Sequence, residues 1–185
     1  MKTVYLHFPP DGQIPALPCI RKRKLVKYYT RETLAAVLAV SQLLDGEPLP
    51  ASTPFYYASA DCENFVCFRE VFEKYKETGV SAFDAERYLA FAPPTSHFKS
   101  MRNMVSCFVS IENDLHGDNN VIVDSASALL YAALTAPDQG NVLVGAGFLH
   151  SDDSVEVGFA LAEPAEFAGH PLLGSSRPAI DIFKP

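Results

Sequence analysis

Apolar and polar residues alternate with a period of two in several short segments of this chain, and such alternation predicts β-strands. Residues 4–8 and 154–162 place apolar side chains on one face, whereas residues 55–58 form a short apolar run typical of a buried strand. The segments predicted to be strands are residues 4–8, 55–58, 121–123, 141–147 and 154–162.

The intervening segments repeat their apolar residues with the helical period of about 3.6. Thr30 provides an N-cap for a helix that stops before Gly46, and Asp61 provides one for a helix that stops at Gly79. The widest apolar face runs over residues 96–115, which predicts a long, mostly buried helix with a narrow polar stripe. The predicted helical segments are residues 30–44, 61–79, a turn near 85–89, 96–115 and 126–136.

Strands and helices therefore follow one another in the order βαβα, then the long helix, then βαββ. This order predicts an α/β fold with a mixed, mostly parallel sheet that is covered by helices. A chain of 185 residues is expected to form a single domain over residues 1–185, with its core at about 28–163 and irregular termini.

Composition and charge narrow the class of protein further. Hydrophobic residues make up 48% of the chain, which favours a packed core over disorder. No apolar run reaches the roughly 20 residues of a membrane span, and the N-terminus lacks the features of a signal peptide, so we expect a cytoplasmic protein. A formal net charge of −7 argues against nucleic-acid binding.

One basic cluster interrupts this acidic background, at Arg21, Lys22, Arg23 and Lys24. It is interpreted as a solvated surface segment, with a docking site for an acidic partner as the alternative. Cys62 and Cys67 form a C-x4-C pair without a second pair or a nearby histidine, so neither a metal nor a cofactor is expected.

Residues 94–147 combine several spaced features. The segment reads PTSHFKSMRNMVSCFVSIENDLHGDNNVIVDSASALLYAAL and, after a short gap, NVLVGAG. A proline loop leads to Asn103-Met104, a buried helix carries Ser110-Ile111, and the helix ends at Leu115-His116-Gly117 before a strand, a turn and a strand with glycines. This pattern resembles the N-terminal half of a β-ketoacyl synthase of the thiolase fold. The chain is similar to truncated ketosynthase-like proteins such as the short chain-length-factor-like subunit of aryl polyene synthases.

The resemblance implies half of a thiolase-like fold, with the nucleophile position at the start of the helix after residues 121–123. By ungapped count that position falls on Ala126, flanked by Ser125 and Ser127, where a condensing enzyme carries a cysteine. A condensing enzyme needs a thiolate, whose pKa is lowered at a helix N-terminus. The family's histidines come from the second half of the fold, which this chain lacks. The chain is therefore expected to be non-catalytic.

The resemblance also implies partners. The expected function is a chain-length-factor-like subunit that forms a heterodimer with a full-length β-ketoacyl-ACP synthase, stabilises it and shapes its acyl tunnel in fatty acid or polyene (aryl polyene, polyketide-type) biosynthesis. An acidic acyl carrier protein could dock on the basic cluster. The strand implied at the dimer interface is Asn119, Asn120, Val121, Ile122 and Val123. The residues implied to line the tunnel are Phe68, Val71, Phe72, Thr95, Ser96, Phe98 and Ser100.

Two other functions stay open at this point. Ser125 or Ser127 could serve a free-standing acyl thioester hydrolase or acyltransferase, provided that a general base such as His97 or His116 lies within hydrogen-bond reach. Alternatively, the chain could be a homodimeric acyl-binding module without a catalytic partner.

Overall fold

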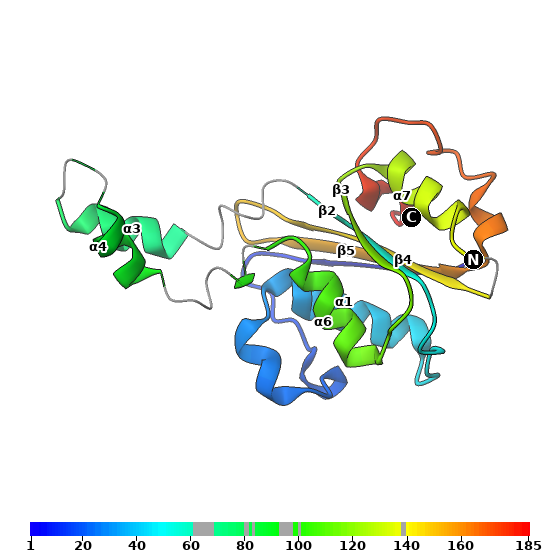
Figure 1. The fold of residues 1–185 in the computed structure, drawn as a ribbon, viewed down its shortest axis with the longest axis horizontal. Helices are drawn as coiled ribbons and strands as arrows, with labels where there is room; N and C mark the ends of the chain where they lie inside the picture. The colour runs from blue at the N-terminus through cyan, green and yellow to red at the C-terminus, as the bar shows by residue number, and fades with distance from the viewer. Residues whose placement is uncertain (61–68, 80–81, 83, 93–97, 100, 138–139) are drawn as a thin grey trace.

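The computed structural model describes residues 1–60, 69–79, 82, 84–92, 98–99, 101–137 and 140–185. Within these residues, five strands form one sheet in the order β1-β5-β4-β2-β3 (Figure 1). The strands are β1 Lys2–Phe8, β2 Phe55–Ser59, β3 Asn119–Val123, β4 Val142–Leu149 and β5 Val155–Ala162. Each predicted strand is present, within a few residues of its expected limits.

The sheet is mixed. β2 pairs in parallel with β3 and with β4, whereas β5 pairs antiparallel with β4 and with β1. Four strands therefore run in one direction and β5 alone runs against them. The expected α/β class with a mixed sheet is confirmed.

Helix α1, Arg31–Leu44, forms as its local signals predict. The Thr30 hydroxyl accepts a hydrogen bond from the Thr33 backbone N–H at 3.1 Å, which caps the first turn. The helix ends at Asp45, whose φ of 49° is left-handed, followed by Gly46 at 86°. The cap and the stop are both contained in the local sequence, so this helix could be predicted with its ends.

The prediction of one long helix over 96–115 is wrong. Helix α6 covers only Met104–Asn113 and stops at Asp114, which has a φ of 56°. Before it, residues 102–103 form a turn, and Met101 is 48% exposed. The spacing of apolar residues indicates which side chains face the core, but not which backbone groups form helical hydrogen bonds. Because the same spacing continues through the turn at residues 102–103, it did not show where the helix begins.

The other α-helices in the described part of the chain are α3 Arg69–Glu77, α4 Ala85–Phe91 and α7 Ala126–Leu134. Asp84 caps α4 by accepting a hydrogen bond from the Arg87 N–H at 3.2 Å, so the predicted turn is a short helix. The expected cap at Asp61 lies outside the described residues. Helices α3 and α4 pack on each other and lie to one side of the sheet (Figure 1).

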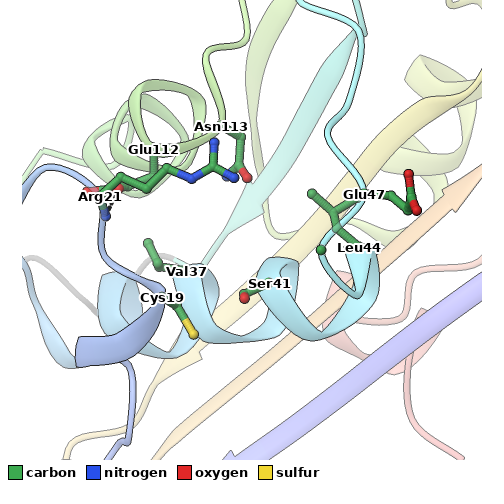
Figure 2. A pocket seen from close by; sticks show the side chains of 9 residues that line it. Cys19, Arg21, Val37, Ser41, Leu44, Glu47, Glu112 and Asn113 are labelled. Atoms are coloured by element: carbon green, nitrogen blue, oxygen red, sulfur yellow. Dashed lines mark hydrogen bonds between the residues drawn. The ribbon is translucent and has the colours of Figure 1, made fainter.

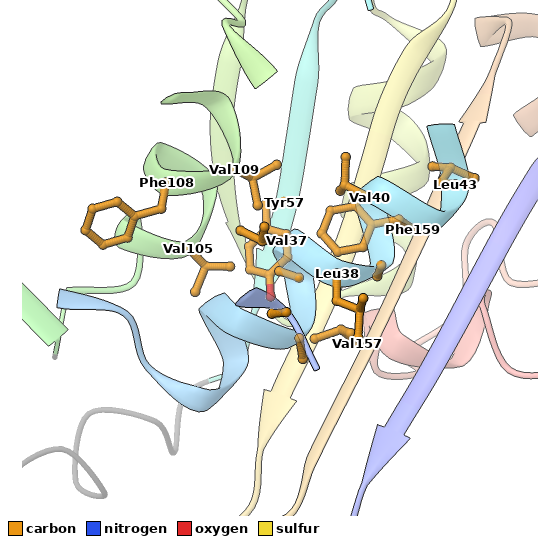
Figure 3. Close-up of a cluster of buried hydrophobic side chains, with 14 of the residues drawn as sticks. Val37, Leu38, Val40, Leu43, Tyr57, Val105, Phe108, Val109, Val157 and Phe159 are labelled. Atoms are coloured by element: carbon orange, nitrogen blue, oxygen red, sulfur yellow. The ribbon is translucent and has the colours of Figure 1, made fainter. Parts of the chain in front are cut away.

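Two hydrophobic cores lie on opposite faces of the sheet. On one face α1 and α6 cover stacked rings, with the ring centres of Tyr57 and Phe159 5.9 Å apart (Figure 3). On the other face α7 packs with the C-terminal segment over β2 and β4. Both faces of β2 are thus buried, which explains why its sequence is a continuous apolar run.

The C-terminal residues are short on regular structure, as expected, yet they belong to the packed fold. They form 3-10 turns at Pro164–Phe167 and Ala179–Ile182, and Phe167 and Ala179 are fully buried. Gly158 allows the close approach of Phe183, because a Cβ at this glycine would overlap the Phe183 side chain. The apolar spacing of residues 179–183 was the local signal for this packing.

Candidate functional site

The β3–α7 junction carries the position implied for a nucleophile. The chain leaves β3 with the Asp124 N–H donating to the Ser59 carbonyl at 3.1 Å. Ser125 is the N-cap of α7, and Ala126 is its first residue. Ala126 is fully buried, so the side chain at this position is a methyl group without access to solvent.

Both neighbouring serines act in backbone hydrogen bonds. The Ser125 Oγ accepts from the Ala128 N–H at 3.2 Å, and the Ser127 Oγ accepts from the Gly174 N–H at 3.0 Å. Across the part of the chain that the structure describes, no hydrogen bond joins either serine to a histidine. Neither hydroxyl therefore has a described general base, which a serine nucleophile requires.

The histidines proposed as bases are placed elsewhere or lie outside the description. His116 lies 3.1 Å from Asp114, at the exposed end of α6. His97 falls outside the described residues. His150, which follows β4, lies 2.9 Å from Glu156 on β5.

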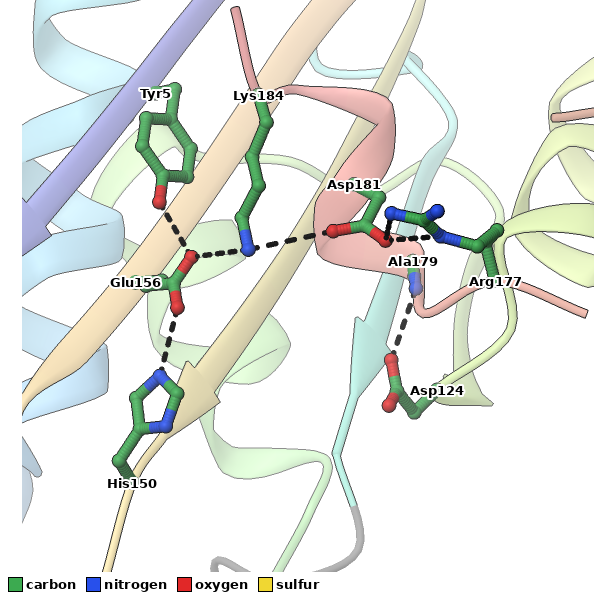
Figure 4. A network of polar contacts seen from close by, with 8 residues as sticks. All are labelled: Tyr5, Asp124, His150, Glu156, Arg177, Ala179, Asp181 and Lys184. Atoms are coloured by element: carbon green, nitrogen blue, oxygen red, sulfur yellow. Dashed lines mark hydrogen bonds and ion pairs between the residues drawn. The ribbon is translucent and has the colours of Figure 1, made fainter. Parts of the chain in front are cut away.

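The C-terminal segment closes the junction from outside. The Ala126 N–H donates to the Arg177 carbonyl at 3.0 Å, and the Asp124 carboxylate accepts from the Ala179 N–H at 3.0 Å (Figure 4). The first N–H of α7, which a bound anion would otherwise use, is thus occupied by the protein's own backbone. The residue pattern gave no sign of this closure, because the contacts join residues about fifty positions apart.

A polar network fastens the same segment to the sheet. Glu156 on β5 accepts from Tyr5 and lies 2.8 Å from the Lys184 Nζ, which also lies 3.4 Å from Asp181 (Figure 4). Burial opposes ionisation of Glu156, but the hydrogen bonds from Lys184, Tyr5 and His150 outweigh it and lower its pKa to about 2. Burial and the adjacent carboxylate together raise the pKa of Tyr5.

The strand implied at a dimer interface lies at an edge of the sheet. β3 pairs with β2 on one side only, and its other backbone edge is free within the described structure. Val123 is 55% exposed there, while Val121 and Ile122 are half-buried. Asn119 donates from its side chain to the Ser110 Oγ at 2.6 Å, which ties the strand to α6.

The described residues implied for the tunnel lie in two separate places. Val71 is buried and Phe72 is 45% exposed against Tyr88 on the α3–α4 hairpin. Phe98 is 47% exposed and packs edge-on to Tyr28, with ring centres 5.9 Å apart. The remaining members lie outside the described residues: Phe68, Thr95, Ser96 and Ser100.

The basic cluster is solvent-exposed, and a buried carboxylate holds its backbone. Glu112 on α6 is 3% exposed and accepts from the Arg21 N–H at 2.7 Å and from the Lys22 N–H at 3.1 Å. The Tyr29 hydroxyl donates to the same carboxylate at 2.5 Å. Beside it lies a cavity of about 50 Å³, lined also by Cys19 (Figure 2). The residue pattern did not predict this role for Glu112, because acidic side chains are seldom buried.

A second buried acid, Glu32 on α1, accepts a hydrogen bond from Tyr57 on β2. Gly147 on β4 makes room for this pair, because a Cβ there would overlap both the Tyr57 hydroxyl and the Glu32 carboxylate. One of the glycines that end β4 is therefore required by the packing of a buried polar pair. The glycine itself was the sequence signal, but its partner could not be read from the pattern.

Within the described ranges, no three His, Cys, Asp or Glu side chains gather as a metal site would require. Over the same ranges, no helix has the length and apolar character needed to cross a bilayer. Burial raises the pKa of the Cys107 thiol, so that thiol is not activated as a nucleophile.

No protein-family model and no curated protein matches the chain.

Proposed function

We propose that this chain is a non-catalytic, chain-length-factor-like subunit that pairs with a full-length β-ketoacyl-ACP synthase and shapes its acyl tunnel. The proposal rests above all on Ala126, a buried methyl group at the N-terminus of α7 that the chain's own C-terminal segment covers. Together with the motifs that resemble a ketosynthase, this arrangement supports the proposal of a condensing-enzyme frame without its reactive thiol.

The chemistry of the position supports a structural role. A thiolate at a helix N-terminus is stabilised by free N–H groups and the helix dipole. Here the Ala126 N–H is bonded to Arg177, and the Ser125 hydroxyl receives the Ala128 N–H. The junction can therefore be rigid and well packed, but it offers neither a nucleophile nor a free anion site.

The free edge of β3 supports a partner. Unpaired backbone groups on a sheet edge readily bind another strand, and isolated proteins usually protect such an edge. Val123 on β3 is an exposed apolar residue at this edge, and Ile111 on α6 and Tyr131 on α7 are also exposed. An interface of this composition suits a permanent protein partner.

The α3–α4 hairpin supports the tunnel-shaping part of the proposal. Two helices of nine and seven residues are too short to be stable by themselves, and they pack mainly on each other. Phe72 and Leu89 remain exposed on them. Arg69 anchors the hairpin to the β4–β5 turn through Asp153 at 3.1 Å, which leaves its apolar side chains to meet a partner.

The exposed side chains of Arg21 to Lys24 are proposed as the contact for the acidic carrier protein that delivers acyl groups. Their backbone is fixed by Glu112, so the charges are presented on an ordered segment. Reversing all four charges should slow elongation at low salt, and an unchanged rate with unchanged salt dependence would refute the contact.

Co-expression with a full-length β-ketoacyl-ACP synthase tests the pairing. The two chains should co-purify in equal amounts, and a thiol-directed inhibitor should label only the full-length partner. Val123→Asp should weaken the pairing by about tenfold, because it places a charge on the edge strand. Leu17→Asp is the matched control, since Leu17 is 66% exposed on a different part of the surface. A solitary monomer that turns over acyl thioesters would contradict the proposal.

A further inference from the structure

An open apolar groove lies between the basic segment and α6, away from the β3–α7 junction. It measures about 250 Å³ and is lined by Leu25, Tyr28, Phe98, Met104 and Phe108. Phe108 is 4% exposed and forms the base of the groove. The Tyr29 ring packs against Phe108, with the two ring centres 4.6 Å apart. Phe98 and Tyr28 meet edge-on and form one wall.

The rim of this groove is positively charged. Leu25 and Tyr28 belong to the 3-10 helix Arg23–Tyr28, whose basic side chains are exposed. The Lys27 ammonium lies 4.9 Å from the centre of the Tyr28 ring, which places one cation directly beside the lining. In a chain of net charge −7, this is a local reversal of sign.

From this juxtaposition we infer that the groove binds the alkyl chain of a medium-chain fatty acid, with its carboxylate at Lys27. The lining has hardly any polar surface, so an apolar ligand binds favourably there, whereas a polar ligand would lack hydrogen-bond partners. The volume is below the range of about 300–1,000 Å³ that drug-sized ligands occupy, so it suits one unbranched chain. Charge complementarity at the rim selects an anionic head group over a neutral or cationic one.

Such a site is independent of the proposed pairing, because every residue in it belongs to this chain and none lies on β3. Binding would hold whether or not a ketosynthase is present. It would give the subunit an acyl-chain contact made by its own residues, and one of them, Phe98, is also implied for the tunnel.

Displacement of a dansyl-labelled undecanoic acid from the purified full chain tests the site. The chain contains no Trp, so the dansyl signal can be excited without energy transfer from that residue. Decanoate should displace the probe saturably, decanol more weakly, and decyltrimethylammonium least. Raising the salt concentration should weaken decanoate and leave decanol unchanged.

Variants separate the groove from general hydrophobic adsorption. Phe98→Ser should weaken both decanoate and decanol by about tenfold, since it removes one apolar wall. Lys27→Glu should weaken decanoate by about fivefold and leave decanol unchanged. Leu17→Ser and Lys74→Glu are the matched controls, because they remove an exposed apolar side chain and an exposed lysine from outside the groove.

Far-UV circular dichroism should be the same for all four variants, because each change is at the surface. The inference is overturned by non-saturable displacement, by equal losses in the control variants, or by a cationic analogue that binds as well as decanoate. Loss of affinity in Phe98→Ser together with an unchanged Lys27→Glu would overturn the assignment of the carboxylate to Lys27.

Discussion

Replacing Glu112 by alanine should destabilise the protein by about 3 kcal/mol. The buried carboxylate accepts hydrogen bonds from two backbone N–H groups, of Arg21 and Lys22, and from the Tyr29 hydroxyl. Alanine removes the acceptor from three donors, the buried Tyr29 hydroxyl and two part-buried backbone N–H groups, at about 1 kcal/mol each at the low end of the usual range. The release of one buried charge offsets part of the loss.

Glutamine separates charge from shape at the same site. Its amide oxygen can still accept, but its NH₂ group would face a donor, so Glu112→Gln should lose about half as much as alanine. Glu73→Gln is the control, because the Glu73 side chain is 61% exposed and, among the described residues, its ion pair is with Lys76 on the surface of α3.

Urea unfolding followed by circular dichroism measures these differences. For a domain of this size, a loss of 3 kcal/mol should lower the Tm by about 6–12 °C. The fatty-acid affinity of Glu112→Ala should also fall, since the segment that holds Leu25 and Tyr28 loses its anchor. A loss of less than about 1 kcal/mol for alanine would refute the reasoning, because it would mean that other contacts hold the segment.

Three further predictions concern other parts of the fold. Gly147→Ala should cost about 3 kcal/mol or more in urea unfolding, because the added methyl would overlap Tyr57 and Glu32; a cost under about 1 kcal/mol would show that the pair can shift freely. Glu156 has a folded pKa of about 2 against an ordinary value of 4.5, so its stabilisation is complete above pH 4.5 and is lost as the pH falls towards 2. Glu156→Gln should therefore flatten unfolding free energy against pH in that window, and an unchanged profile would contradict the assigned contacts. Phe72→Ala should lengthen the products of the co-purified ketosynthase by mass spectrometry, and unchanged product lengths would remove Phe72 from tunnel gating.

Local signals were sufficient for much of the fold. Helix α1 could be predicted with its ends, because Thr30 caps it and Asp45-Gly46 stops it through contacts within a few residues. The strand β2 could be predicted from its continuous apolar run, and β5 from the alternation of its large apolar residues with small or polar ones, although both faces of each strand are buried. The start of α6 could not, because the apolar spacing continued across a turn.

The candidate site divides in the same way. The residue pattern placed Ala126 at the head of a helix after a strand, and the structure has it there. The C-terminal segment covers this position through Arg177, which bonds to Ala126, and Ala179, which bonds to Asp124. Both residues lie about fifty positions further along the chain, so the local pattern could not indicate the contact. Glu112 is a stronger case, since its donors lie 83 to 91 positions away.

By itself, the sequence determined the α/β class, the positions of the strands and the absence of a thiol at the junction, since each depends on residue type and short-range spacing. Only the tertiary structure decided that β3 is an edge, that the C-terminal segment covers Ala126, and that a basic segment borders an apolar groove. These three features depend on contacts between residues that are far apart in the sequence. The free energy of such a contact depends on which distant residue the fold places beside it, and the periodicity of apolar residues does not identify that residue.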